Sequence, residues 1–230
     1  DMDALPLQEE NEHGYRSQND GCMHACGHDG HTSILLMVAE KLVAVRSQVK
    51  GRILLVFQPA EEGEGGAQAM IDSGLLERFT PKCAAGLHLW SESPTGEVHI
   101  CDGPFMASTD LFEVTVQGQG GHGAVPHSAR DPVVAAAQMI LGLQTIVSRR
   151  VDPEDSAVLT VGMIQGGDAF NIIPDQVRFA GTVRTFSKDV QAELRTSMAS
   201  ILEGIAKGAG MSVDLRYEER TMPTVNDPFW

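Results

Sequence analysis

The sequence has little that would take the protein into a membrane or out of the cell. Its longest apolar stretches, near Ile34 and Val133, are interrupted by Glu40, Lys41 and Gln138, well short of the ~18 apolar residues that a spanning helix needs. No basic segment followed by an apolar one opens the sequence. We therefore expect no membrane partner and a cytoplasmic location.

Basic residues and cysteines are also scarce. Lys plus Arg total 17 against 31 Asp plus Glu, the net charge is −14, and the longest basic run is Arg149-Arg150. Such a surface repels phosphate backbones and anionic lipids, which excludes nucleic acid as a partner. Four cysteines without a secretory leader do not indicate a disulfide framework. Cys22, Cys83 and Cys101 are therefore predicted to be small buried thiols in a reducing compartment.

The first half of the chain alternates between helical and strand patterns. Hydrophobic residues make up 42% of the 230 residues, enough for one large or two ordinary domains. A helix capped by Asp29 is predicted to end near Lys50, and another spans 67–73. Unbroken apolar runs at 53–57 and 84–89 indicate strands buried on both faces, as in a parallel sheet. This half therefore predicts an α/β layer.

From about Ser108 the pattern changes to strands with one wet face. Apolar residues at 112, 114 and 116 alternate with polar ones. A helix from Asp131-Pro132 is predicted to reach Arg150, and a second helix capped by Ser187 ends near Gly208. Further strands are predicted at 157–164, 177–186 and 213–217. The order β-α-β-β-α-β is typical of the ferredoxin-like split unit.

Three segments far apart in the sequence carry side chains that metals prefer. They read HACGHDGH at 24–31, PAEEG at 59–63 and GLHLW at 86–90. Two of them follow predicted strands, and strand ends meet at one rim of an open α/β sheet. A lone histidine is more often structural, and a Glu-Glu pair is usually a solvated face. The combination, however, indicates one metal site.

The residue types suit zinc or a similar divalent ion. Cys26 and His28 are two residues apart, and Gly27 between them lets the backbone bend so that both face one cation. Glu61 and Glu62 are adjacent, and successive side chains on extended backbone point apart. One carboxylate can then hold the cation while the other moves a proton, as metal-assisted hydrolysis requires.

One motif resembles the dinucleotide-binding fingerprint but does not meet its other requirements. The run GQGGHG at 118–123 fits the glycine-rich fingerprint, but Pro126 and Pro132 oppose a helix opening on its last glycine. No acidic residue stands about 20 positions further on, where the fingerprint requires one. The run is interpreted either as a flexible turn presenting His122, with His127 close behind, or as a plain hairpin connection.

At these residues the sequence resembles the metal-dependent aminoacylase and carboxypeptidase family. Within it, the resemblance is to the amidohydrolase branch of hippurate hydrolases, N-acetyl-diaminopimelate deacetylases and indole-acetyl-amino-acid hydrolases. The motifs occur in the family's order through nearly the whole chain. They are DMDALP at 1–6, HACGHD at 24–29, PAEEG at 59–63, GLHLW at 86–90, GHGA at 121–124 with Pro126-His127, NIIP at 171–174 and GTVR at 181–184.

The resemblance implies a zinc-peptidase-like α/β catalytic domain with an inserted ferredoxin-like α+β domain that acts as a lid and mediates dimerisation. Residues 1–107 and 222–230 would form the catalytic domain and residues 108–221 the lid. Because the chain starts at Asp1 and stops at Trp230 without a closing element, we expect the catalytic domain to be truncated, incomplete at both ends. The family's last metal-binding histidine comes from a segment beyond Trp230, which leaves the ligand set incomplete.

The resemblance also implies a site for two divalent metal ions, either Zn, Mn, Co or Ni. The expected ligands are Cys26, His28, Glu62 and His88. Cys26 would bridge the two ions, Glu61 would be the general base, and Asp3 would orient a ligand.

In the lid, His122 would stabilise the developing oxyanion, from the same or a partner subunit. Asn171 and Arg184 would bind substrate, with the guanidinium of Arg184 clamping a carboxylate.

The expected reaction is hydrolysis of the amide bond of a small-molecule N-acyl amino acid by a metal-activated water, in a homodimer formed through the lid. The alternative is a catalytically inactive, truncated homologue that serves as a dimerising binding or structural module. Bound metal and release of free amino acid distinguish the two.

Overall fold

The computed structural model describes residues 1–63 and 65–228; Phe229 and Trp230, where the expected cut falls, lie outside the described residues. Internal contacts divide the chain into a first unit, Asp1–Val98, and a second unit that begins at His99. The domain limits expected at 107/108 and 221/222 stay predictions. None of the described helices is both long enough and apolar enough to cross a membrane.

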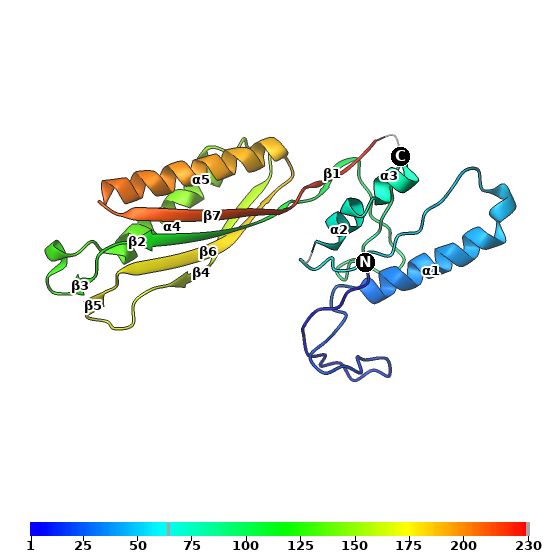
Figure 1. The fold of residues 1–230 in the computed structure, drawn as a ribbon, viewed down its shortest axis with the longest axis horizontal. Coiled ribbons are helices and arrows are strands. Elements are labelled where there is room, and N and C mark those ends of the chain that lie inside the picture. The colour runs from blue at the N-terminus through cyan, green and yellow to red at the C-terminus, as the bar shows by residue number, and fades with distance from the viewer. Residues whose placement is uncertain (64, 229–230) are drawn as a thin grey trace. The chain divides into compact units, whose positions relative to one another are not determined.

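The second unit is built on a four-stranded antiparallel sheet. Its strands are β2 (Thr109–Gln117), β4 (Ala157–Gln165), β6 (Gln176–Thr185) and β7 (Ser212–Thr221), in the spatial order β4-β6-β2-β7. Helices α4 (Pro132–Arg149) and α5 (Lys188–Gly208) pack against each other and against the sheet, as Figure 1 shows. The predicted β-α-β-β-α-β order is confirmed, and the strand order is that of the split βαβ unit.

Alternating burial explains why these strands form one layer. Along β2, Phe112, Val114 and Val116 are buried while the residues between them are partly exposed. They meet Phe179 and Leu143, among others, in one hydrophobic core between the sheet and the helices. Burying each such side chain stabilises the fold by about 1.5–3 kcal/mol.

The helix starts of this unit follow the sequence closely. The Asp131 carboxylate accepts the backbone N–H of Val133 at 2.9 Å, and Pro132 occupies the first helical position of α4. The Ser187 hydroxyl accepts the N–H of Val190 at the start of α5. Both caps satisfy donors that have no partner inside the helix, which confirms the predicted boundaries to within a residue.

Short elements complete the second unit. Strand β1 (Gly103–Met106) pairs with β8 (Thr224–Asn226), and β3 (Gly121–His122) pairs with β5 (Ile172–Ile173). A 3-10 turn, η2 (Pro126–Ser128), follows β3. No helix therefore opens on the last glycine of the 118–123 run, as expected.

A buried carboxylate ties three elements of the second unit together. Asp110 is fully buried on β2 and accepts hydrogen bonds of 2.7 Å from Gln191 Nε2 on α5 and from the Tyr217 hydroxyl on β7. Burial, and then the Asp110 carboxylate, raise the pKa of Tyr217 above its usual range, so the hydroxyl stays a donor.

Tyr217→Phe is expected to lower the free energy of unfolding by about 1.5–3 kcal/mol, the usual value of a hydrogen bond to a charged group. Tyr15→Phe is the matched control, because Tyr15 is 86% exposed and its loss should leave stability unchanged. Chemical denaturation of both variants measures the difference. Equal stability of the two would mean that Asp110 is satisfied without Tyr217.

The first unit contains helices but no strand among its described residues. Its elements are α1 (His28–Ala44), the 3-10 turn η1 (Arg46–Gln48), α2 (Gly66–Asp72) and α3 (Leu75–Phe79). The N-cap of α1 is Gly27 at φ 88°, a backbone conformation that side chains with a Cβ rarely adopt. The predicted cap, Asp29, instead lies in the first turn of α1, where its charge favours the positive helix end.

The strands predicted at 53–57 and 84–89 are wrong. Both segments lack regular secondary structure, and Ile53 and Leu87 are 54% and 56% exposed. An extended run becomes a strand only when a neighbour completes its hydrogen-bond ladder, and no described residue pairs with these segments in a ladder. The apolar runs show that these segments are hydrophobic, but they do not show whether a neighbouring strand pairs with them.

The cysteines of both units and the N-terminal loop of the first unit complete the outline of the fold. All four cysteines are free thiols, but Cys83 and Cys101 are exposed, so their predicted burial is wrong. Residues 6–22 form a loop closed at its neck by two backbone hydrogen bonds between Leu5 and Met23, of 2.9 and 3.0 Å.

Candidate metal centre

The three predicted metal-preferring segments converge in the first unit. Cys26 Sγ lies 3.5 Å from His88 Nε2, and His28 Nε2 lies 3.7 Å from a Glu62 carboxylate oxygen and 3.8 Å from one of Glu61. Ligand atoms of Cys26, His28 and His88 lie within 4.8 Å of one another, as do those of His28, Glu61 and Glu62. The structure thus brings the four predicted ligands and the predicted base together around His28.

His28 occupies the first turn of α1 and is completely buried. Neither ring nitrogen of His28 has a hydrogen-bond partner. Asp3 Oδ1, which lies 3.3 Å from His28 Nδ1, also lacks one. A buried polar atom left without a partner costs about 1–3 kcal/mol. A cation at Nε2, with Nδ1 facing the Asp3 carboxylate, would satisfy both sides of the ring, so the residues fit a bound divalent metal.

Asp3 holds the segment that carries the two glutamates. Its Oδ2 accepts the backbone N–H of Glu62 at 2.9 Å. Burial by itself would raise the pKa of Asp3, but hydrogen bonds from the backbone N–H groups of Glu62 and Glu61 outweigh it and lower that pKa to about 2. Asp3 is therefore a carboxylate at neutral pH, placed to orient both His28 and the Glu61-Glu62 backbone.

The backbone before the glutamates is strained. Ala60 has φ 53°, in the left-handed region that a residue with a Cβ seldom occupies, and its carbonyl accepts the N–H of Gly66. Strain of this kind costs about 1–3 kcal/mol and clusters at functional sites. Here it turns the chain immediately before Glu61 and Glu62.

The two glutamates differ in exposure and in neighbours. The side chain of Glu61 is 46% exposed and that of Glu62 is 27% exposed. Burial first, and then the hydrogen bond and negative charge of Glu62, raise the pKa of the Cys26 thiol to about 11. Glu62 therefore sits against Cys26, whereas Glu61 is the carboxylate more open to solvent.

His31, one turn after His28 on α1, has both ring nitrogens occupied. Its Nδ1 lies 2.6 Å from Asp1 Oδ1, and its Nε2 accepts the backbone N–H of Leu89 at 2.8 Å. Burial, the largest cause, lowers the pKa of His31 and favours the neutral ring that this acceptor role requires. Although Asp1, His28 and His31 are close enough to hold an ion, these hydrogen bonds leave His31 no nitrogen for a metal.

Sequence reasoning gave Asp1 and His31 no role. The helical spacing of three residues between His28 and His31 placed both on one helix face, but the partners of His31 are 30 and 58 residues away along the chain. Only the fold reveals them.

The predicted lid residues lie in the second unit, in two separate places. His122 on β3 pairs in register with Ile172, and the N–H of Gly123 donates to the carbonyl of Asn171 at 2.9 Å, so His122 and Asn171 are neighbours. Arg184 lies eight residues beyond Gln176, the start of β6, or about 26 Å along the strand at ~3.3 Å per residue.

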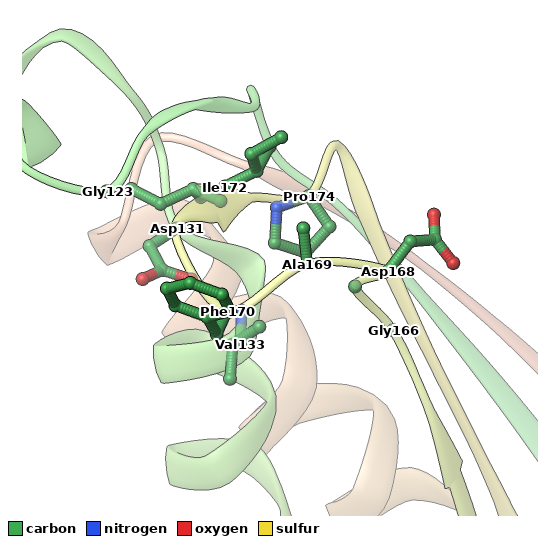
Figure 2. A pocket seen from close by; sticks show the side chains of 11 residues that line it. Gly123, Asp131, Val133, Gly166, Asp168, Ala169, Phe170, Ile172 and Pro174 are labelled. Carbon is green, nitrogen blue, oxygen red and sulfur yellow. Dashed lines mark hydrogen bonds between the residues drawn. The ribbon is translucent and has the colours of Figure 1, made fainter.

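A pocket lies beside His122 and Asn171. It has a volume of about 490 Å³ and is lined by the loop 166–170, by β5 and by the start of α4. Figure 2 shows Phe170 on this loop together with Asp131 and Val133 at the start of that helix, and the ring of Phe170 is fully exposed. Nothing in the residue pattern of this loop marked it as a pocket wall.

Comparison with known proteins gives the following matches. The model of peptidase family M20/M25/M40 matches residues 1–228. An N-acetyl-L-cysteine deacetylase from Bacillus subtilis is 42% identical over 227 residues, covering 99% of this chain and 54% of that protein. An N-acetyldiaminopimelate deacetylase from Priestia megaterium is 43% identical over 208 residues, covering 90% and 55%.

Among solved structures, the Bacillus subtilis YXEP protein, a dinuclear metal-binding peptidase of the M20 family, superposes with a TM-score of 0.78. It is 34% identical, and the match covers 98% of this chain and 57% of that one. The chain thus spans a little over half the length of the relatives it matches.

Proposed function

We propose that this chain, which belongs to peptidase family M20/M25/M40, carries the metal centre of an amidohydrolase that cleaves the amide bond of N-acyl amino acids. Membership confirms the family resemblance noted in the sequence, and the chain has the α/β fold of the family. The observation that carries the proposal is the gathering of thiol, imidazole and carboxylate groups around the unpartnered nitrogens of His28.

The substrate class follows from the relatives, two of which are named as deacetylases of N-acetyl amino acids. The proposed substrate is therefore a small N-acyl amino acid. A role as an inactive dimerising module is not favoured, because nothing in a structural module requires ligand atoms gathered around a buried, unsatisfied histidine.

Cys26, His28, Glu62 and His88 would hold two divalent metal ions. The relative named as dinuclear supports this number. When bound, such ions polarise the amide carbonyl and lower the pKa of water toward neutrality. The anionic groups that raise the pKa of the Cys26 thiol also attract a cation, and a cation at Sγ favours the thiolate.

Glu61 is the proposed general base. Its greater exposure leaves its carboxylate open to water and substrate, while Glu62 faces Cys26. Glu61 would take a proton from the attacking water and deliver it to the amine that leaves. His122 would hold the developing negative charge on the carbonyl oxygen, and Asn171 and Arg184 would bind the rest of the substrate.

The lid residues also support a homodimer. The β3–β5 pair, which carries His122 and adjoins Asn171, lies at the end of the sheet where β6 begins (Figure 1), and Arg184 lies eight residues along β6 from that end, or about 26 Å at ~3.3 Å per residue. One small N-acyl amino acid cannot span that distance. If both groups act on one substrate, His122 and Asn171 come from one copy of the chain and Arg184 from another.

Metal removal tests the proposed function. The purified protein is expected to contain divalent metal, to release free amino acid from hippurate and from N-acetyl amino acids, and to lose turnover on chelation while remaining folded by circular dichroism. Restoring Zn, Mn, Co or Ni one at a time identifies the ion that returns activity. Metal-free protein without turnover would instead support the inactive module, and turnover that survives complete chelation would contradict the metal mechanism.

A further inference from the structure

Leu89 is held by two histidines that belong to different parts of the metal centre. Its N–H donates to His31 Nε2 at 2.8 Å, and its carbonyl oxygen lies 2.6 Å from His88 Nδ1. The rings of His31 and His88 lie edge to face, with centroids 4.6 Å apart. Since a carbonyl only accepts, His88 Nδ1 carries the proton, and its Nε2 lone pair faces Cys26 Sγ at 3.5 Å.

The hydrogen bonds of His31 fix its tautomer. Nε2 accepts an N–H and must therefore present a lone pair, which places the ring proton on Nδ1, opposite the Asp1 carboxylate. Both bonds require the same tautomer, so Asp1 and Leu89 together set the orientation of the His31 ring.

Leu89 has few other restraints. No strand pairing of the described residues includes the 84–90 segment, so no sheet ladder holds its backbone. The side chain of Leu89 rests on two glycines of the α1 start, because a Cβ on Gly30 would overlap Leu89 Cδ1 and one on Gly27 would lie 3.3 Å from Leu89 Cβ. The hydrogen bond to His31 is thus the polar contact that fixes the Leu89 peptide on α1.

We propose that His31 is a positioning residue of the metal centre, which acts through the Leu89 peptide to place His88 Nε2 beside Cys26. The proposal rests on the proposed function, because it assigns His31 a role in that metal centre. The metal-affinity measurement that tests it requires no catalytic activity. It predicts that the Leu89 hydrogen bond, rather than the presence of an imidazole, determines how well the site binds metal. It also explains why a nearly buried histidine inside the centre is not itself a ligand.

Two amide substitutions separate the two hydrogen bonds of His31. In His31→Gln the amide oxygen can reach the position of Nε2 and accept the Leu89 N–H. In His31→Asn the shorter amide can donate to Asp1 but does not reach Leu89. Loss of an outer partner of a metal ligand typically lowers metal affinity by about 10–100-fold. We expect that loss for His31→Asn, and less than about threefold for His31→Gln.

The readout is Zn²⁺ affinity by competition with a chromophoric chelator, supported by the thiolate-to-Co²⁺ absorption of the cobalt-loaded protein. Thermal unfolding of the metal-free variants monitors the fold, and His127→Asn, an exposed histidine on η2, serves as the matched control. Equal affinity in both His31 variants, whether wild-type or equally weakened, would overturn the proposal. So would a fall in stability with unchanged affinity.

If His31→Asn does not fold, His31→Gln decides alone, because a tenfold or greater loss of affinity in that variant overturns the proposal. These measurements need no substrate. Failure of the proposed amidohydrolase activity would therefore leave them interpretable, and normal metal binding in both variants would leave that activity untouched.

Discussion

Replacing Glu61 with glutamine is expected to lower kcat by about 10²–10⁴-fold, the usual contribution of a general acid–base, while bound metal stays at the wild-type level. Glutamine keeps the size and hydrogen-bonding reach of the side chain but cannot take a proton from water. Glu61 is the more exposed of the two adjacent glutamates and lies 3.8 Å from His28 Nε2. Steady-state kinetics with an N-acyl amino acid, together with metal analysis of the same sample, measures both quantities.

Glu62→Gln is the matched control, because it changes the neighbouring residue by the same chemistry. Glu62 faces Cys26 and has its backbone N–H held by Asp3, so this variant should lose metal as well as turnover. Wild-type turnover in Glu61→Gln would refute Glu61 as the base. Equal metal loss in the two variants would show instead that both carboxylates are ligands.

Mixing two inactive variants is expected to restore activity. His122→Ala and Arg184→Ala should each reduce turnover by about 10²–10³-fold, if loss of His122 resembles loss of an oxyanion donor. When dimers of the two variants are dissociated and reassembled together, half become mixed, and one of the two sites in each mixed dimer regains both residues. Activity should then return to about one quarter of wild type, as expected for a two-fold symmetric dimer.

The physical reason is the separation of His122 from Arg184 within one copy of the second unit, which exceeds the length of a small substrate. A control mixes wild type with the double variant His122→Ala/Arg184→Ala. Shared sites then predict about one quarter of wild-type activity, whereas sites built from one chain predict about one half. No recovery in the first mixture, with half activity in the control, would place both residues in the same subunit.

The second unit was predictable because its signals are local. The alternation at 112, 114 and 116 determines the buried face of β2, and Asp131 and Ser187 cap their own helices through donors two or three residues away. Interactions of this range are contained in a short window of sequence. Strand order and the Asp110 network, by contrast, depend on contacts between elements that no single window contains.

The residue types of the candidate site could be predicted from the sequence, but the hydrogen bonds that connect them could not. Residue types at Cys26, His28 and His88 indicated a metal, and the motif order indicated the family. The partners of His31 could not be found, because one is at the start of the chain and the other follows His88. The predicted strands failed for a similar reason, since pairing depends on a neighbour that an apolar run does not identify.

The closed neck of the N-terminal loop has a consequence for how such a protein can diversify. Asp3 lies just before the Leu5–Met23 closure and Cys26 just after it, so both ends are anchored where they serve the centre. Doubling the length of a flexible loop costs only about 0.6 kcal/mol. Insertions between residues 6 and 22 therefore cost little free energy and leave the residues of the candidate metal centre in place. This stretch is where evolution, or an engineer, can vary the chain's surroundings without rebuilding the candidate metal centre.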